Sequence, residues 1–193
     1  MSKHLALLSA AALGALALTA AVVAPVSAQD KMKSEMSGEK TVMVGGAAMF
    51  PSKNIIQNAV NSKDHTTLVA AVKAAGLVQT LEGKGPFTVF APTNAAFGKL
   101  PAGTVDTLVK PENKATLTKI LTYHVVPGKL EASSLTDGKK LKTVEGEELT
   151  VKKSGDKVMI VDAKGDSSTV TISNVNQSNG VIHVIDTVLM PAS

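Results

Sequence analysis

The sequence predicts an α+β domain in which helices occupy the first half and strands dominate the second. Between residues 54 and 122, apolar side chains recur mostly at helical spacing. From residue 139 onward, short β-prone segments are separated by turns rich in glycine and aspartate, and a final segment, 181–189, is apolar on both faces. Helices followed by strands within about 165 residues favour one domain of this class.

Capping residues mark the first two predicted helices. Ser52 or Asn54 is placed to cap a short helix over residues 55–60, because its side chain can accept from free amides of the first turn. Asp64 is placed to cap a second helix in the same way, and Gly76 is placed to end it. The helical half therefore opens with two short helices.

A short strand over residues 87–90 interrupts the helices and ends at Pro92. Thr93 or Asn94 then caps a helical turn that carries small and aromatic side chains. Two more helices are expected, a short one at residues 105–109 and a longer one at residues 111–124.

The strand half is predicted to be an antiparallel meander, because its turns are short and closely spaced. Its strands are expected at residues 139–144, 147–153, 157–162 and 168–173. Asn179 and Gly180 fit a tight turn that needs a positive φ. The last strand, 181–189, is apolar on both faces, which predicts that both faces are covered.

Residues 1–28 are predicted to be a secretory signal peptide. A positively charged start precedes a run of almost only Ala, Leu and Val, and Val26 and Ala28 place small residues before the cleavage point. The alternative is an uncleaved anchor, because about 20 apolar residues suffice to span a bilayer. We expect a flexible polar linker at 29–41, a single folded domain at 42–193, and a secreted protein, periplasmic or extracellular, without stable membrane insertion.

The composition excludes several function classes. The chain has no cysteine, which excludes thiol catalysis, cysteine zinc sites and disulfides. All 20 basic residues are lysines, and only five residues are aromatic. Because arginine and aromatic side chains are the preferred base readers and stacking platforms, we expect no nucleic-acid partner. The net charge of +4 favours anionic surfaces only weakly.

Methionines in the linker suggest an alternative function. Met32 and Met36 carry thioethers, which favour Cu(I), so a copper-binding tail is conceivable in an exported protein. His65 is a further candidate ligand. Met43 and Met49 instead lie in an apolar stretch that we expect to pack on the domain. A copper or small-ligand protein is therefore the alternative to the leading interpretation, which needs no cofactor.

Three segments resemble the motifs of fasciclin (FAS1) domains. Residues 85–97, GPFTVFAPTNAAF, are similar to the first signature motif of this family. Residues 179–191, NGVIHVIDTVLMP, are similar to the second, and 123–128, YHVVPG, resemble the tyrosine–histidine motif between them. The helical segment TLVAA at 67–71 also agrees, so the resemblance covers residues 54–191.

The resemblance implies a FAS1-like β-wedge of about seven strands flanked by several short helices, of the single-domain secreted bacterial type. It also implies a non-enzymatic module for adhesion and matrix contact. The lysines bias its partner toward a protein or an acidic glycan of the envelope or matrix. In the family, the segment that matches Tyr123 and His124 is linked to integrin-type adhesion; the residues alone suggest that both shape the surface from within. The other motif positions are expected to maintain the fold: Thr88, Phe90, Ala91, Pro92, Thr93, Asn94, Phe97, Asn179, Gly180, His183 and Asp186.

The polar residues of the motifs are expected to be structural rather than reactive. His124 and His183 lie on apolar faces, so we expect core histidines that hydrogen-bond to the backbone and make the fold sensitive to acid. Asp186 shares an apolar face and needs a hydrogen-bond donor or an exposed end. A hydrolase could combine His183, Asp186 and Ser178, but no nucleophile elbow, metalloprotease helix or phosphate loop is present. We therefore predict that the protein is not an enzyme.

Overall fold

The computed structural model describes residues 40–192. The predicted signal peptide lies outside the described residues, as do Met32, Met36 and all but the last two residues of the predicted linker. The helices and 3₁₀ turns are α2 (Ile55–Ala59), η1 (Lys63–His65), α3 (Thr66–Ala75), α4 (Val78–Glu82), α5 (Asn94–Gly98), α6 (Thr104–Leu108), η2 (Pro111–Asn113), α7 (Lys114–Tyr123) and η3 (Ala132–Ser134). The strands are β1 (Val42–Val44), β2 (Ala47–Met49), β3 (Phe87–Pro92), β4 (Val125–Pro127), β5 (Lys140–Lys142), β6 (Glu148–Ser154), β7 (Lys157–Val161), β8 (Ser167–Gln177) and β9 (Gly180–Ile185).

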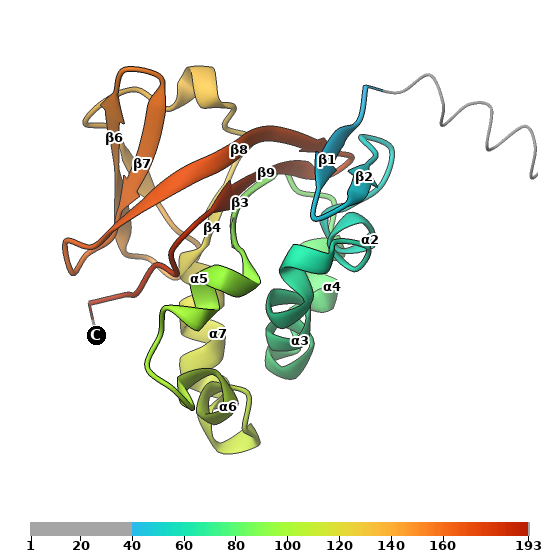
Figure 1. Cartoon of the computed structure of the whole chain (residues 1–193), viewed down its shortest axis with the longest axis vertical. Helices are drawn as coiled ribbons and strands as arrows, with labels where there is room; N and C mark the ends of the chain where they lie inside the picture. The colour runs from blue at the N-terminus through green and yellow to red at the C-terminus, as the bar shows by residue number, and fades with distance from the viewer. Residues whose placement is uncertain (1–39, 193) are drawn as a thin grey trace, which may run out of the picture.

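Seven strands form one mixed sheet in the order β4-β3-β9-β8-β7-β6-β5. Strands β3 and β9 are parallel, and every other neighbouring pair is antiparallel. The two edges of the sheet approach each other, because the Val144 N–H donates to the Val125 carbonyl across 2.8 Å. The sheet is therefore nearly closed, and Figure 1 shows the α-helices gathered on one side of β3 and β9 with β6, β7 and β8 on the other.

The hydrophobic interior has two parts that share the central strands. One part, the helical core, packs α2, α3 and α7 against one face of β3 and β9, with Val89 and Ile182 among its members. The other part, the sheet core, lies inside the curl of the sheet and contains Phe90, Tyr123 and Ile185. Every residue of β9 is buried, which confirms the prediction of a last strand covered on both faces.

Three of the four predicted capping positions are confirmed, and the one at Asp64 is wrong. The Asn54 side chain accepts from the Gln57 N–H, and Gln57 bonds back to the Asn54 N–H, which makes a capping box at α2. Gly76 ends α3 in the left-handed conformation, with φ 75°. Asp64 does not cap α3, because it lies inside η1; the Thr67 N–H of α3 donates to the Asn94 side chain instead, across 3.0 Å.

Thr93 caps α5, with the Ala96 N–H donating to its hydroxyl across 3.2 Å. Asn94 is thereby free to bind the start of α3 and the Lys63 carbonyl, so it joins two helices rather than starting its own. The prediction that one of these two residues caps α5 is confirmed for Thr93. The hydrogen bond between Asn94 and α3 could not be predicted from the sequence, because it joins residues 27 positions apart.

The predicted meander is confirmed from β5 to β9, with shifted boundaries. Strand β8 runs on to Gln177 through two irregular points in its pairing with β9, whereas β9 itself ends at Ile185. The segment at residues 42–50 packs on the domain as expected, but as a hairpin of β1 and β2 that was not predicted. Its Met49 is buried, and its Met43 is exposed, which corrects the expectation that both methionines pack inside.

The role expected for Gly180 is also corrected. Gly180 does not have a positive φ, so a left-handed turn is not the reason for the glycine. Instead, a Cβ atom at this position would lie 2.0 Å from the Phe87 carbonyl oxygen, far inside contact distance. Gly180 is therefore required by the close approach of β9 to β3.

Candidate functional site

The two signature motifs meet as one pair of parallel strands at the centre of the sheet. Phe87 pairs with Gly180, and Phe90 pairs with His183, in a register that runs the length of both strands. Because parallel strands need a long crossover connection, residues far apart in the chain come together here.

Thr88 joins the central strand to the loop after β4. Its side chain is fully buried, and its hydroxyl donates to the Gly128 carbonyl across 2.6 Å. The same oxygen accepts from the Leu130 N–H across 2.8 Å. The hydroxyl donates one hydrogen bond and accepts another, both with backbone groups, so the buried Thr88 side chain holds the loop to the strand.

Asn179 joins three segments at the start of β9. Its side-chain oxygen accepts from the Ile55 N–H at the start of α2, across 3.1 Å. Its amide group donates to the carbonyls of Leu81 and Gly83 at the end of α4, across 2.7 and 2.8 Å. The buried amide thus satisfies one free helix start and one free helix end, which is a structural role.

His183 lies buried beside the Phe90 ring, with the ring centroids 5.7 Å apart. The Asn174 N–H donates to Nδ1 across 3.4 Å, which leaves the proton on Nε2, and Nε2–H donates to the Leu130 carbonyl across 2.7 Å. Burial lowers the pKa of His183, against the opposing effects of the Leu130 carbonyl and the Glu131 charge. The ring is therefore neutral near pH 7.

The tyrosine–histidine pair is buried, at 0% exposure for Tyr123 and 2% for His124. The Tyr123 hydroxyl accepts from the Ala163 N–H across 2.9 Å, and burial raises its pKa to about 12. His124 Nδ1–H donates to the Ile120 carbonyl across 2.8 Å, and Nε2 accepts from the Leu189 N–H across 3.0 Å. Neither side chain reaches the surface of the folded domain.

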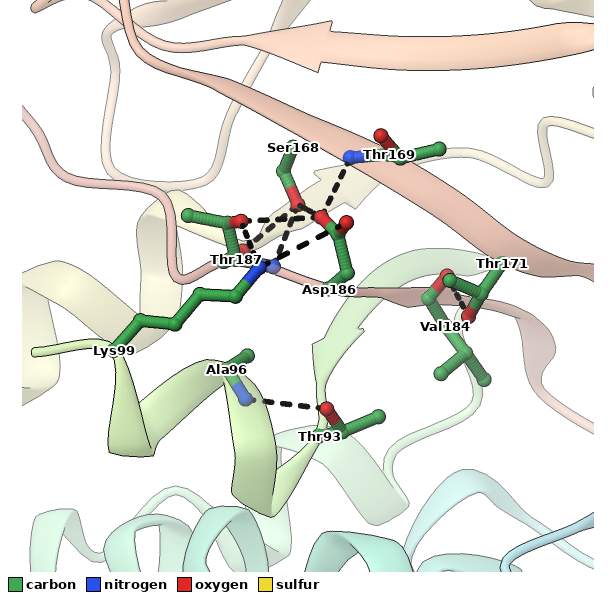
Figure 2. Close-up of polar contacts among 9 residues, drawn as sticks. All are labelled: Thr93, Ala96, Lys99, Ser168, Thr169, Thr171, Val184, Asp186 and Thr187. Carbon is green, nitrogen blue, oxygen red and sulfur yellow. Dashed lines mark hydrogen bonds and ion pairs between the residues drawn. The ribbon is translucent and has the colours of Figure 1, made fainter.

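Asp186 has the donors that its position requires. Its carboxylate accepts from the Thr169 N–H across 2.8 Å and from the Thr187 hydroxyl across 3.1 Å, and Lys99 lies 3.8 Å away (Figure 2). Burial raises the pKa of Asp186, but these hydrogen bonds and the Lys99 charge outweigh it, so the pKa lies below its ordinary value. Asp186 therefore joins α5 to the turn after β9.

These contacts leave no reactive constellation among the motif residues. His183 and Asp186 bind different groups, and both ring nitrogens of His183 and of His124 are occupied by the backbone. Within residues 40–192, no three His, Cys, Asp or Glu side chains gather where they could hold a metal ion. The described helices are too short or too polar to cross a bilayer.

The outer face of β5, β6 and β7 is an accessible surface with an excess of positive charge, because it carries four exposed lysines. We call it the lysine face; its lysines are Lys140, Lys142, Lys152 and Lys157. The register places them on one side, because Lys140 pairs with Thr150, Lys142 with Glu148 and Lys152 with Met159, while Leu141, Leu149, Val151, Val158 and Ile160 point to the sheet core. Glu148 is the one acid on this face within the described strands, and it lies 3.3 Å from Lys140.

The lysine face was missed in the sequence, although its signal is present there. Lysines alternate with buried apolar residues in β5, and the period of two places such lysines together on one face. The alternation of charge on the opposite face was the observation that would have revealed this surface.

The comparisons with known proteins agree with the architecture. The family model described as the fasciclin domain matches residues 63–191. A FAS1 domain pair from the insect cell adhesion molecule fasciclin I has a similar fold, with a TM-score of 0.65 and 18% identity; the match covers 73% of this chain and 52% of that one. The predicted FAS1 fold, a sheet of seven strands with short flanking helices, is thereby confirmed.

Several bacterial proteins are similar to this chain in sequence. Protein sll1483 of Synechocystis is 50% identical over 153 residues, which cover 79% of this chain and 82% of that one. The immunogenic protein MPB70 of Mycobacterium bovis is 35% identical over 199 residues, with 99% and 98% covered. The cell surface glycolipoprotein MPB83 of the same species is 40% identical over 153 residues, with 77% of this chain and 64% of that one covered. The motifs in register, the fold and these relatives agree with the match to the family model. The chain therefore belongs to the fasciclin domain family.

Proposed function

We propose that this protein is a secreted or periplasmic, non-enzymatic FAS1 module that binds an anionic glycan or an acidic protein of the cell envelope or matrix through the lysine face. The lysine face carries the proposal, with four lysines against one glutamate. The cell-surface location of the MPB83 relative and the leader predicted at residues 1–28 support the location. The ring nitrogens of His124 and His183 are all hydrogen-bonded to the backbone, which supports a binding role over a catalytic one.

The spacing of the lysines suits an extended anionic polymer. Alternate residues of a strand lie about 7 Å apart, and neighbouring strands lie about 5 Å apart, so the four ammonium groups form a two-dimensional array. Threonines on the same face, Thr150 and Thr169, add hydroxyls that can pair with sugar oxygens. Contacts of this kind between exposed charges are screened by salt.

The adhesion attributed to the tyrosine–histidine motif fits this proposal only indirectly. Tyr123 and His124 are buried, so in the folded domain they act by supporting the backbone around them. Tyr123 holds the turn after β7 through the Ala163 N–H and belongs to the sheet core beneath the lysine face. A partner would therefore contact the surface that these residues support.

The test compares two variants with equal loss of charge. In the first, the four lysines of the lysine face are changed to glutamine. In the second, four exposed lysines elsewhere are changed in the same way: Lys63, Lys73, Lys84 and Lys110. Retention of the full chain on an immobilised carboxylated polysaccharide, with neutral dextran as the blank matrix, is measured over a salt gradient.

We expect the first variant to elute at clearly lower salt than the native chain, and the second to elute close to it. Equal losses in both variants would mean that net charge alone determines retention, and the lysine face would have no special role. No retention of the native chain at low salt would contradict glycan binding. Retention on immobilised polyglutamate but not on the polysaccharide would assign the face to an acidic protein.

A further inference from the structure

The outer face of the sheet carries two large apolar side chains among its lysines. Met159 of β7 pairs with Lys152 of β6 and with Thr169 of β8. Val161, two residues further along β7, pairs with Thr150. Because residues that pair across strands share a face, both apolar side chains lie on the same side of the sheet as the lysines. We call Met159 and Val161 the apolar pair.

The apolar pair does not pack inside the protein. Val158 and Ile160 alternate with these two residues along β7, and they point into the sheet core. Among the described residues, neither the helical core nor the sheet core includes Met159 or Val161. Both side chains are half-buried, so neighbours on the outer face cover part of them. The hydrophobic interior therefore does not account for them.

Lysines border the apolar pair on two sides. Lys152 stands directly opposite Met159, and Lys140 lies in the same cross-strand row as Val161, two strands away. Lys157 lies two residues before Met159, on the same side of β7. The Cβ atoms of a directly opposed pair are about 5 Å apart, so the methylene stem of Lys152 can lie along the thioether while its ammonium group remains in water. The surface is therefore amphipathic.

The acidic residues near this surface stand further from the apolar pair. Glu148 lies 3.3 Å from Lys140 at the β5 side of the face. Asp156 lies in the turn between β6 and β7, and Asp166 lies in the turn before β8. In the register of β6, β7 and β8, none of these three acids stands opposite Met159 or Val161. The charge next to the apolar pair is thus that of lysine.

An anionic lipid layer matches this combination of groups. It presents phosphates to the lysines and, directly below them, glycerol and acyl groups to apolar side chains. The sheet is nearly closed, so its outer face is convex, whereas an anchor side chain from a protein partner needs a pocket. A fluid lipid layer needs no matching pocket. Figure 1 shows β6 and β7 at the end of the sheet that the α-helices do not cover.

We propose that the lysine face and the apolar pair together form a docking surface for an anionic lipid layer. The ammonium groups pair with lipid phosphates, and Met159 and Val161 enter the layer at the depth of the glycerol groups. Each lysine close to an anionic surface strengthens the partitioning by about fivefold. The proposal goes beyond the function proposed above and does not depend on it, because a glycan needs only the lysines.

A single-site reporter tests the contact, because the chain has no tryptophan. Met159→Trp places an indole on the docking surface, and Met43→Trp places one at an exposed methionine of β1. Each chain is purified in exported form, so that the apolar leader predicted at residues 1–28 does not itself bind lipid. The chains are titrated with vesicles of phosphatidylcholine and phosphatidylglycerol, and with vesicles of phosphatidylcholine alone.

We expect the tryptophan emission of Met159→Trp to move to shorter wavelength with the anionic vesicles only, because the indole enters the interface. High salt should reverse this shift, since the lysine contacts are screened. The emission of Met43→Trp should stay unchanged. The proposal is overturned by no shift in Met159→Trp, by equal shifts in the two variants, or by an equal shift with phosphatidylcholine alone.

Two double variants that keep the charge test the native side chains by co-sedimentation with the anionic vesicles. Met159→Thr with Val161→Thr removes the apolar pair, and we expect binding about 5- to 20-fold weaker. Met43→Thr with Val60→Thr removes the same residue types at exposed positions elsewhere, and should bind within about twofold of the native chain. The lysine-to-glutamine variant of the lysine face should bind about 100-fold more weakly or worse.

Thermal denaturation first shows that each variant is folded. If the variant without the apolar pair sediments as the native chain does, these side chains do not contact lipid and the proposal fails. Retention of the native chain on the carboxylated polysaccharide without sedimentation would leave the glycan function in place and overturn this inference. Sedimentation without retention on the polysaccharide would support this inference and contradict glycan binding.

Discussion

At the residue scale, the buried imidazole of His124 is held in one protonation state by the backbone. Its Nε2 accepts from the Leu189 N–H, so a proton on this nitrogen would break that bond and place a charge in the core. Burial lowers the pKa of His124 to about 4, and the Ile120 carbonyl opposes this only in part. His183 is held in the same way, with Nδ1 as the acceptor.

A lowered pKa predicts loss of stability in acid. In the unfolded chain the histidine pKa is about 6.5. Between pH 6.5 and 4 the His124 imidazole is therefore protonated in the unfolded state and neutral in the folded state. The contribution of His124 to the free energy of unfolding is fully present above pH 6.5. It falls by about 1.4 kcal/mol per pH unit down to pH 4, which is about 3 kcal/mol in total. Urea unfolding of the native chain at pH 7 and pH 5 should show the decline.

The variant His124→Gln assigns this decline to one residue. It removes the titrating group, so we expect lower stability at pH 7 but a difference between pH 7 and pH 5 that is smaller by about 2 kcal/mol. Asp186 does not interfere, because its pKa lies below the ordinary value of 3.8 and its contribution is lost only in stronger acid. An unchanged pH dependence in His124→Gln would contradict the assignment.

At the element scale, the approach of β9 to β3 depends on the absence of a side chain at Gly180. A Cβ atom there would lie 2.0 Å from the Phe87 oxygen and 2.9 Å from its carbonyl carbon. Both neighbours are backbone atoms of the partner strand, so no side chain can move aside. The two strands would have to separate at the point where their pairing begins.

We therefore predict that Gly180→Ala destabilises the fold by about 3 kcal/mol or more, as for other substitutions that force backbone shifts in a packed interior. The matched control is Gly98→Ala in α5, where an added Cβ meets no atom within 4 Å. In a helix that change should be neutral or stabilising by up to about 1 kcal/mol. Chemical denaturation of the two variants measures both values, and equal effects would contradict the prediction.

The sequence predicts those elements whose signals are local. The capping residue Asn54, the stop at Gly76 and the meander from β5 to β9 follow from neighbouring residues and turn chemistry, and the structure confirms them. The cap assigned to Asp64 is wrong because a residue from α5, Asn94, takes its place. Competition between a local and a distant acceptor is decided by packing, which a single sequence does not reveal.

Local sequence patterns could not predict the pairing of strands that lie far apart in the sequence. The parallel register of β3 with β9 joins motifs separated by most of the domain, and nothing near either strand specifies it. The lysine face could have been predicted, since the alternation of lysines in β5 is a local pattern.

At the scale of the whole molecule, the two hydrophobic cores are joined through shared strands. Alternate residues of β9 face the helical core, as Val184 does, and the sheet core, as Ile185 does. Neither core can lose its packing without exposing one face of the same strand. The described domain should therefore unfold as one cooperative unit.

This cooperativity is tested with one cavity in each core. Leu117→Ala removes volume from the helical core and Leu149→Ala from the sheet core, and both leucines are at most 3% exposed. Each should cost about 2–5 kcal/mol and lower the midpoint of the same single transition. Scanning calorimetry that resolved two transitions, one sensitive to each variant, would contradict the prediction.

The central position of β9 also determines when the domain can fold. Residues 180–185 are synthesised after every other strand, yet they lie between β3 and β8 in the finished sheet. Until the ribosome has added them, β3 and β8 lack the strand that pairs with both, and closing so long a loop costs entropy that only the complete sheet repays. We therefore expect a nascent polypeptide that lacks these residues to remain unfolded until they have been translated.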